Sequence, residues 1–532
     1  MDLAENILSQ YTDAKKDRDK WTGLWDELHS YYQPMKRSTI QQGQIGDEKI
    51  FESTPEYALN LLASGLGGLL TDGSDSWYKA RHRDQSKADD TQVKEFLERV
   101  EEKLKHVFTG DDTGFAQHDH ELLFEVCLVG TGAMYVEADP ETLVRFSTLP
   151  LPQCVVSESS KGRVDTLFRE YEMSARAIMQ EWEDEASDKV KELAQKKPET
   201  KVAILHAVFP REGINKGIGV ENMPFASVYM EKDSKTVLEQ SGYQEFPFMV
   251  PRWSKAAGEV FGRSPGMTAL SDTRVLNAIS KTGLMGAEKM ADPPMLVPDD
   301  SFLGPIRSGP GGLSYYRTGT GDDVKQLPIR VDLAATERML ERREKSILRI
   351  FMYEIMSSPE TSGTAYEWWV RQGEKLRLVK PVLTRLTSEY LVMLLKRVLG
   401  ILHRSGELGP FPSGMTIDDI VLSVENAITR LRRAQESSGL PQVINSLAPF
   451  AQTPQERAEM MDNFDVDKIV RHQCDSNALP PSYLRDPDEV EARRKKREED
   501  MQAQQAVAGA GQLMNFAQQA QQLEDPNGGN AK

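Results

Sequence analysis

The spacing of hydrophobic and polar residues predicts two long helices near the middle of the chain. From Asp332 to Met356, apolar residues recur every three or four positions, as on one face of an amphipathic helix. A similar stripe runs from about Thr364 to His403. Pro381 removes one backbone hydrogen bond within it, which predicts a kink. About 40 helical residues extend about 60 Å, so this segment favours a coiled coil or the wall of a large ring.

Further helices are predicted on both sides of this pair. One covers residues 2–32 and ends at Pro34, and a second begins at Thr54-Pro55, where threonine can cap and proline suits the first turn. Residues 90–129 are helical with a break near Gly110. A charged helix is expected from Ser174 to Lys196.

Short runs rich in β-branched and aromatic residues predict strands in the first half of the chain. These runs are 133–137, 143–148, 154–158, 163–169, 202–209, 225–231 and 246–252. The fold class is therefore α+β and mainly helical.

The remaining segments alternate helix and loop. Ser264-Pro265 opens a helix to Met290, and residues 291–331 form a compact insertion rich in proline and glycine. After His403, a stretch rich in glycine and proline runs to Gly414, and the part that follows is expected to be helical. The tail from Met501 is rich in glutamine and alanine.

Composition narrows the class of protein. The chain has 65 basic and 82 acidic residues and a net charge of −17, which argues against a protein that coats or reads DNA with a basic face. Its three cysteines share no close spacing, which excludes a disulfide framework or a cysteine-based zinc site and fits a reducing compartment. The polar N-terminus is no signal peptide, and the most apolar run is too short to span a bilayer. We expect no membrane insertion and synthesis in the cytoplasm.

One motif suggests catalysis. Gly262-Arg263-Ser264-Pro265-Gly266 matches the G-x-S-x-G pattern of serine hydrolases, with Ser264 as the nucleophile. However, Pro265 lacks the backbone N–H that should help to form the oxyanion hole. Ser264 as a helix N-cap explains the same residues, so the hydrolase is kept only as an alternative.

Other candidate sites are weaker still. His118-Asp119-His120-Glu121 lacks a metal-binding spacing, and Gly130-Thr131-Gly132 lacks the third glycine of a dinucleotide site. Trp368-Trp369 favour packing over base stacking, and the basic run 493–497 favours a solvated helix over nucleic-acid or partner contact. No phosphate-binding loop of the ATPase type occurs. We therefore expect no catalytic residue, cofactor or metal.

Several blocks of residues occur in a characteristic order along the chain. The most specific block is Pro247-Phe248, Arg252-Trp253 and Gly258 to Pro265. Others are Trp25 to Pro34, Ala58 to Leu66 followed by Trp77, Gly130 to Glu137, a partial motif at Gly363 to Glu367, and Ala434-Gln435. The order of these blocks resembles the head-to-tail connecting, or portal, proteins of short-tailed, T7-like phages.

The resemblance implies a homododecameric ring with wing, stem, clip and crown regions. The corresponding ranges are an α+β wing at 1–263, stem helices at 264–290 and 332–356, a clip at 291–331, a tunnel loop at 357–363, a long kinked wing helix at 364–403, a helical crown at 404–500, and a tail or barrel at 501–532.

The resemblance also implies a role in viral genome packaging and ejection within the virion. Double-stranded DNA would pass through the channel, and the ring would meet the terminase motor, tail adaptor, capsid and scaffolding proteins. The tunnel loop facing the DNA would consist of Ser357, Ser358, Pro359, Glu360, Thr361, Ser362 and Gly363.

Overall fold

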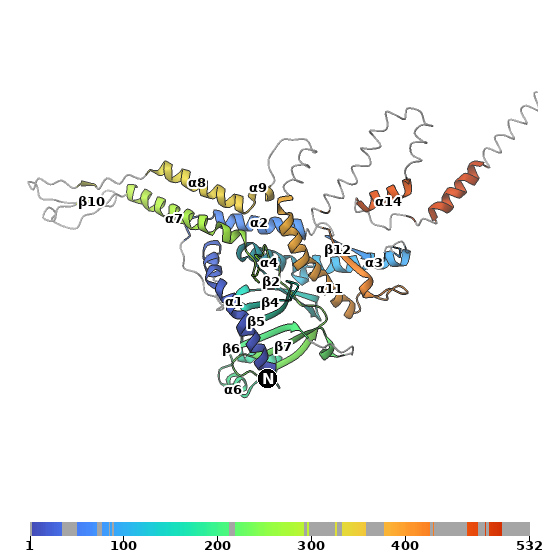
Figure 1. Ribbon diagram of the computed structural model, residues 1–532, viewed down its shortest axis with the longest axis horizontal. Coiled ribbons are helices and arrows are strands. Elements are labelled where there is room, and N and C mark those ends of the chain that lie inside the picture. Colours follow the sequence, from blue (N-terminus) through green and yellow to red (C-terminus); the bar gives the residue numbers. More distant parts are fainter. Residues whose placement is uncertain are drawn as a thin grey trace, which may run out of the picture. The chain divides into compact units, whose positions relative to one another are not determined.

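The computed structural model confirms the α+β class, with helices and strands in one chain (Figure 1). The chain divides into two compact units. Unit 1 comprises Met1–Asp84 and Phe96–Ile428, and unit 2 comprises Gln85–Glu95 and Thr429–Lys532. The structure describes residues 3–33, 50–71, 77–84, 86–87, 90–211, 219–291, 295–296, 325–326, 332–357, 377–425, 429, 465–476, 485 and 489–502.

A five-stranded antiparallel sheet with the order β4-β5-β6-β7-β8 lies in unit 1. Its strands are β4 (Cys154–Glu158), β5 (Val164–Ser174), β6 (Lys201–Pro210), β7 (Phe225–Glu231) and β8 (Val237–Tyr243). Helix α1 (Leu3–Tyr32) packs on one face through Ile7 and Tyr11. Helices α5 (Ala175–Glu181) and α6 (Asp188–Lys196) pack on the other face. Alternate side chains of the central strands β5, β6 and β7 therefore enter two separate cores.

A second, three-stranded sheet lies beside a group of helices. It has the order β3-β2-β9, from β3 (Leu143–Leu149), β2 (Ala133–Asp139) and β9 (Phe248–Met249). The helices are α2 (Thr54–Leu70), α3 (Thr91–Thr109) and α4 (Phe115–Val129), and a 3-10 turn, Asp111–Thr113, separates the last two as the sequence predicts. Residues 122–129 of α4 are all buried, so this helix lies within the core.

Several sequence predictions need correction. The single helix expected from Ser174 to Lys196 is two helices, because Ser187 caps α6 by accepting a hydrogen bond from the Val190 N–H. The strand expected over 246–252 shortens to β9, since the following residues form loop contacts. Strand β1 (Tyr78–His82) pairs with β12 (Ile420–Val424), so the region 404–500 is not wholly helical. Local patterns could not reveal a pairing between strands so far apart in sequence.

Helices α7 (Pro265–Ala291) and α8 (Leu333–Ile350) lie side by side and antiparallel (Figure 1). The Asp272 carboxylate accepts hydrogen bonds from Arg343 and Ser346, each at 2.7 Å. Leu333 was expected on the apolar face but is exposed. Between the helices, β10 (Met295–Leu296) pairs with β11 (Lys325–Gln326), and the rest of 292–331 lies outside the described residues.

Helix α8 ends earlier than the predicted Met356. Met352 adopts a left-handed backbone with φ +56°, which interrupts the helix before a short turn, α9 (Tyr353–Met356). This break changes the direction of the chain, and the Met356 side chain packs against α2 at Gly65, where a side chain would be in the way. A Cβ atom at Gly65 would lie 2.6 Å from the Met356 sulfur.

The long helix before His403 contains a π turn. Residues 377–386 are α-helical, Thr387–Leu391 form the π turn, and α11 (Val392–Arg404) continues the rod. Pro381 lies within the α-helical residues 377–386, where the expected kink stays a prediction, and the departure from α geometry begins six positions later, at Thr387. Buried residues at 386, 390, 394 and 398 are each four apart. In a regular helix each such step drifts by about 40°, and the π turn takes up this drift.

The C-terminal part of unit 2, from Asp465 onward, contains two described helices. They are α14 (Val466–Ser476) and a helix over residues 489–502. Arg494 of the second helix makes two hydrogen bonds of 2.6 Å with Asp467 of the first. This ion pair joins the two helices at the surface of the unit.

Candidate functional site

Ser264 has a structural role at the start of α7. Its side chain is buried, its hydroxyl donates to the Leu128 carbonyl at 2.7 Å, and it accepts from the Met267 N–H at 2.9 Å. Both bonding capacities of the hydroxyl are therefore used by backbone groups. The geometry assigns Ser264 to the N-cap and gives no support to the hydrolase alternative.

The segment around Ser264 crosses the Gly130-Thr131-Gly132 turn at very short range. The Gly262 N–H donates to the Thr131 hydroxyl at 2.8 Å. A Cβ atom on Gly262 would lie 2.1 Å from the Gly130 carbonyl oxygen, so both positions require glycine. The structure thus brings together two blocks that carried the family resemblance but lie far apart in sequence.

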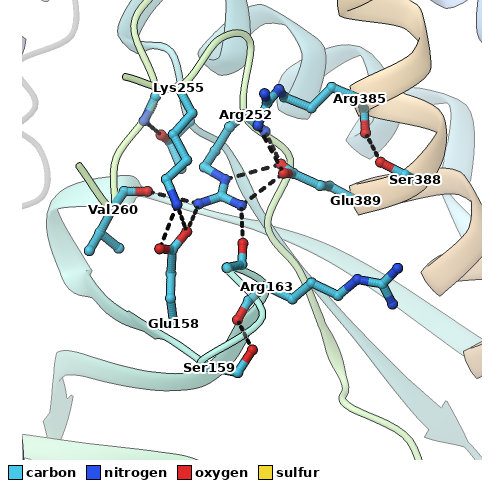
Figure 2. Close-up of polar contacts among 12 residues, drawn as sticks. Glu158, Ser159, Arg163, Arg252, Lys255, Val260, Arg385, Ser388 and Glu389 are labelled. Carbon is cyan, nitrogen blue, oxygen red and sulfur yellow. Dashed lines mark hydrogen bonds and ion pairs between the residues drawn. The ribbon is translucent and has the colours of Figure 1, made fainter. Parts of the chain in front are cut away.

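Arg252 lies at the centre of this crossing, and we call its contacts the Arg252 junction (Figure 2). Its side chain is only 1% exposed. Its backbone N–H and guanidinium donate to the Glu389 carboxylate at 3.2, 3.0 and 2.8 Å, and the guanidinium also pairs with Glu158. Two backbone carbonyls, those of Val260 and Gly162, accept at 3.1 and 3.2 Å. One cation therefore joins four segments of unit 1.

The junction holds its groups in their charged forms. Burial opposes the charge on Arg252, but hydrogen bonds and attraction from Glu389 and Glu158 outweigh it and raise the pKa of the guanidinium. Burial also opposes the charge on Glu158, yet bonds from Lys255 and Arg252 lower the pKa of that carboxyl. Lys255 reaches Glu158 at 2.5 and 2.6 Å. The result is a satisfied ion network that stabilises the fold and leaves no reactive group free for chemistry.

The π turn positions the third member of the junction. Glu389 lies within Thr387–Leu391, and Arg385, four residues earlier, also contacts its carboxylate at 3.3 Å. From the sequence, Arg252 stands out only as part of a resemblance, and no pattern marks Glu158 or Glu389. A run of apolar residues at steps of four could have indicated the helix irregularity.

An open cleft of about 650 Å³ lies between α1 and the start of α7. Its charged lining residues are paired with each other, Lys20 with Asp17 and Arg263 with Glu259, each at 2.6 Å. The Arg263 guanidinium also lies 5.6 Å from the centre of the Trp21 ring. These charges are already neutralised, so the cleft shows no feature of a catalytic centre.

The remaining sequence candidates are dispersed. Asp119 is buried between the Thr71 and Tyr390 hydroxyls, whereas His120 contacts the Ser64 hydroxyl. No group of three or more metal-ligating side chains occurs within the part of the chain that the structure describes. Likewise, no helix among these residues is both long and apolar enough to cross a membrane.

Two further candidates fall wholly or partly outside the described residues. Of the predicted tunnel loop, only Ser357 is described, at the end of α9, where its N–H donates to the Tyr353 carbonyl at 2.8 Å. Trp368 and Trp369 lie outside the described ranges. The basic run 493–497 belongs to the exposed helix 489–502, where Arg493 and Arg494 form ion pairs.

Comparisons with known proteins agree along nearly the whole chain. Its sequence is 27% identical over 520 residues to the "Portal protein" of Salmonella phage epsilon15, covering 95% of this chain and 93% of that protein. It is 25% identical over 517 residues to the "Probable portal protein" of Bordetella phage BPP-1, covering 94% and 92%. A chain of the solved structure "Virion of native gene transfer agent (GTA) particle" gives a TM-score of 0.37 at 12% identity, covering 82% and 92%, which supports no inference.

A family comparison defines the relationship. The family model described as "Bacteriophage head to tail connecting protein" matches residues 4–484. This range includes the Arg252 junction and the α7–α8 pair. The chain therefore belongs to the bacteriophage head to tail connecting protein family.

Proposed function

We propose that this chain is a portal protein, which forms a ring at one vertex of a phage capsid and lets double-stranded DNA pass during packaging and ejection. The family match over residues 4–484 carries this proposal. The names of the two relatives, each aligned along more than nine-tenths of this chain, support it. The satisfied charges of the Arg252 junction fit a structural role and not catalysis.

The proposed ring contains twelve copies. Helices α7 and α8 would form its stem, and residues 291–331 its clip, which meets the terminase motor and later the tail adaptor. The wing, 1–263 and 364–403, and the crown, 404–500, would face the capsid and scaffolding proteins. The ion pair between Asp272 and Arg343 supports a rigid stem, because it ties α7 to α8 near the body of unit 1.

A low-friction channel follows from the charge of the chain. Each copy carries a formal net charge of −17, so an acidic or neutral channel wall would repel phosphate and would not hold DNA in fixed positions. The tunnel loop, Ser357 to Gly363, would provide a movable contact with the duplex. A separate motor would supply ATP hydrolysis, in line with the absence of a phosphate-binding loop in the sequence.

Electron microscopy of the purified full-length chain tests the ring directly. We expect rings with an axial hole, and mass photometry should give a mass near twelve copies. A compact monomer at all concentrations would contradict the proposal.

A second experiment tests the tunnel loop separately. Deletion of residues 357–363 should leave the rings intact and impair packaging or retention of full-length DNA in particles. Normal packaging and retention with this deletion would overturn the assigned role of the loop while leaving the ring itself in place.

A further inference from the structure

The outer face of α8 carries a row of cations, which we call the α8 basic stripe: Arg338, Arg342, Lys345 and Arg349. All four side chains are exposed. Their separations of four, three and four residues place them within an arc of about 60° and along about 16 Å of the helix. The stripe is unusual in a chain whose net charge is −17.

The stripe is poorly neutralised by the chain itself. Lys345 lies 3.7 Å from Glu341, but these two side chains are 71% and 67% exposed, so water weakens the pair. Within the described residues, Arg338, Arg342 and Arg349 form no ion pair. Arg343 differs, because it lies off the stripe and pairs with Asp272. Like charges four residues apart also disfavour a helix, so an external anion would stabilise the stripe.

A complementary acidic face lies on the same helix. Glu337, Glu341 and Glu344 repeat the spacing of the stripe one residue earlier, on a face about 100° away. Glu52 adds to this face: the pKa of Glu344 is raised, first by burial and then by the charges of Glu52 and Glu341. We call Glu52, Glu337, Glu341 and Glu344 the α8 acidic patch.

We infer that the α8 basic stripe of one copy docks on the α8 acidic patch of the next copy. This inference rests on the proposed ring, because a closed ring joins two different faces of the same chain, head to tail. Rotation about the ring axis keeps equivalent atoms at equal height. Each acid precedes a cation by one residue, or about 1.5 Å along the helix. For helices that follow the axis, the three glutamates of α8 in the patch and the cations of the stripe therefore meet at matching heights.

Duplex DNA is the competing polyanion. The observations favour a second copy, since Glu337 and Glu341 lie next to the stripe and would repel phosphates that approach it. A neighbouring copy can instead present its acids to the stripe and its cations to the patch of a third copy. The complete surface is then neutralised around the ring.

Charge reversal tests this pairing. The stripe variant carries Arg338→Glu and Arg342→Glu, and the patch variant carries Glu341→Lys and Glu344→Lys. Each variant alone should show at least a tenfold lower fraction of rings by mass photometry. A 1:1 mixture of the two should restore rings, because each variant then meets a neighbour of opposite charge. Mixing cannot rescue a defect that lies only within the folded monomer.

A matched control has the same charge change at another site. Lys189→Glu with Lys196→Glu alters two exposed lysines of α6 and should leave ring formation unchanged. Normal rings from both reversed variants, or failure of the mixture to restore them, would overturn the pairing. Normal rings with weaker DNA retention in the stripe variant would assign the stripe to DNA instead. Absence of rings from the wild-type chain would overturn the proposed function itself.

Discussion

The Arg252 junction and the α8 basic stripe show two opposite ways of treating charge in one chain. Arg252 is buried and has bonds to two carboxylates and two carbonyls. The arginines of the stripe are exposed and lack ion pairs among the described residues. A buried charge must be neutralised within its own chain because desolvation is costly, whereas water solvates an exposed charge until a partner binds. The first cluster serves the fold, and the second serves assembly.

Arg252→Ala should have the largest effect on the stability of the monomer. It leaves Glu389 and Glu158 without their main cationic partner in a largely buried position. We expect the free energy of unfolding to fall by about 3–5 kcal/mol, measured by urea denaturation followed by tryptophan fluorescence. Arg263→Ala removes an exposed arginine from an i,i+4 pair and should change the midpoint little. If the two substitutions lowered the free energy of unfolding equally, the buried and the exposed arginine would contribute equally to stability, which would contradict this comparison.

Gly262→Ala should be the next most damaging change. The added Cβ atom would meet the Gly130 carbonyl oxygen at 2.1 Å, and that oxygen belongs to a backbone held by surrounding hydrogen bonds. We expect a loss of about 1–3 kcal/mol from this overpacking in the same denaturation assay. Gly68→Ala, at an exposed helical position with nothing within 4 Å, serves as the control and should be neutral or stabilising. An unchanged midpoint for Gly262→Ala would show that the crossing can open freely.

Glu158→Gln should make the contribution of the junction visible as a pH dependence. The folded-state pKa of Glu158 is lowered, so its charge stabilises the fold above the usual glutamate pKa of about 4.3, and this contribution disappears as the pH falls through the folded-state pKa. At pH 7 we expect the variant to lose about 1.5–3 kcal/mol. The difference from wild type should shrink in acid, as measured by urea midpoints across pH. A constant difference at every pH would contradict the assigned charge.

Arg342→Gln should have the smallest effect and the opposite sign. It relieves repulsion with Arg338, four residues earlier, and should stabilise the isolated monomer by about 0.2–0.5 kcal/mol, detected as slower hydrogen exchange in α8. Arg343→Gln is the adjacent control, and it should destabilise because Arg343 pairs with Asp272. If both changes were destabilising, the stripe would already be neutralised within the monomer.

Local sequence patterns predict many of the helices and the residues that cap two of them. Ser264 caps α7 as expected, and Asp332 caps α8 in the same way, because capping depends on residues within one turn. The same locality explains the correct break between α3 and α4 near Gly110. The charged residues of α8 can also be recognised in the sequence. Their separation into a basic and an acidic face becomes clear only when the bounds and the buried side of the helix are known.

The Arg252 junction could not be predicted in this way. Glu158 and Glu389 lie 94 and 137 positions from Arg252, and no periodic pattern links them. The pairing of β1 with β12 was not predicted from the sequence for the same reason. The resemblance did mark the Arg252-Trp253 and Gly258–Pro265 blocks, but it gave no indication of what they contact. Contacts over such separations depend on the tertiary fold and not on local propensity.

The π turn has a consequence for changes in chain length. Deletion of Ser388 would remove the one extra residue that the π turn accommodates and let the rod close into a uniform α-helix. The segments on both sides would keep nearly their present faces, so Val379 and Leu383 would stay buried, whereas Glu389, within the turn, would be repositioned. A single in-frame codon loss at this point would therefore disturb the Arg252 junction and leave the course of the rod nearly unchanged.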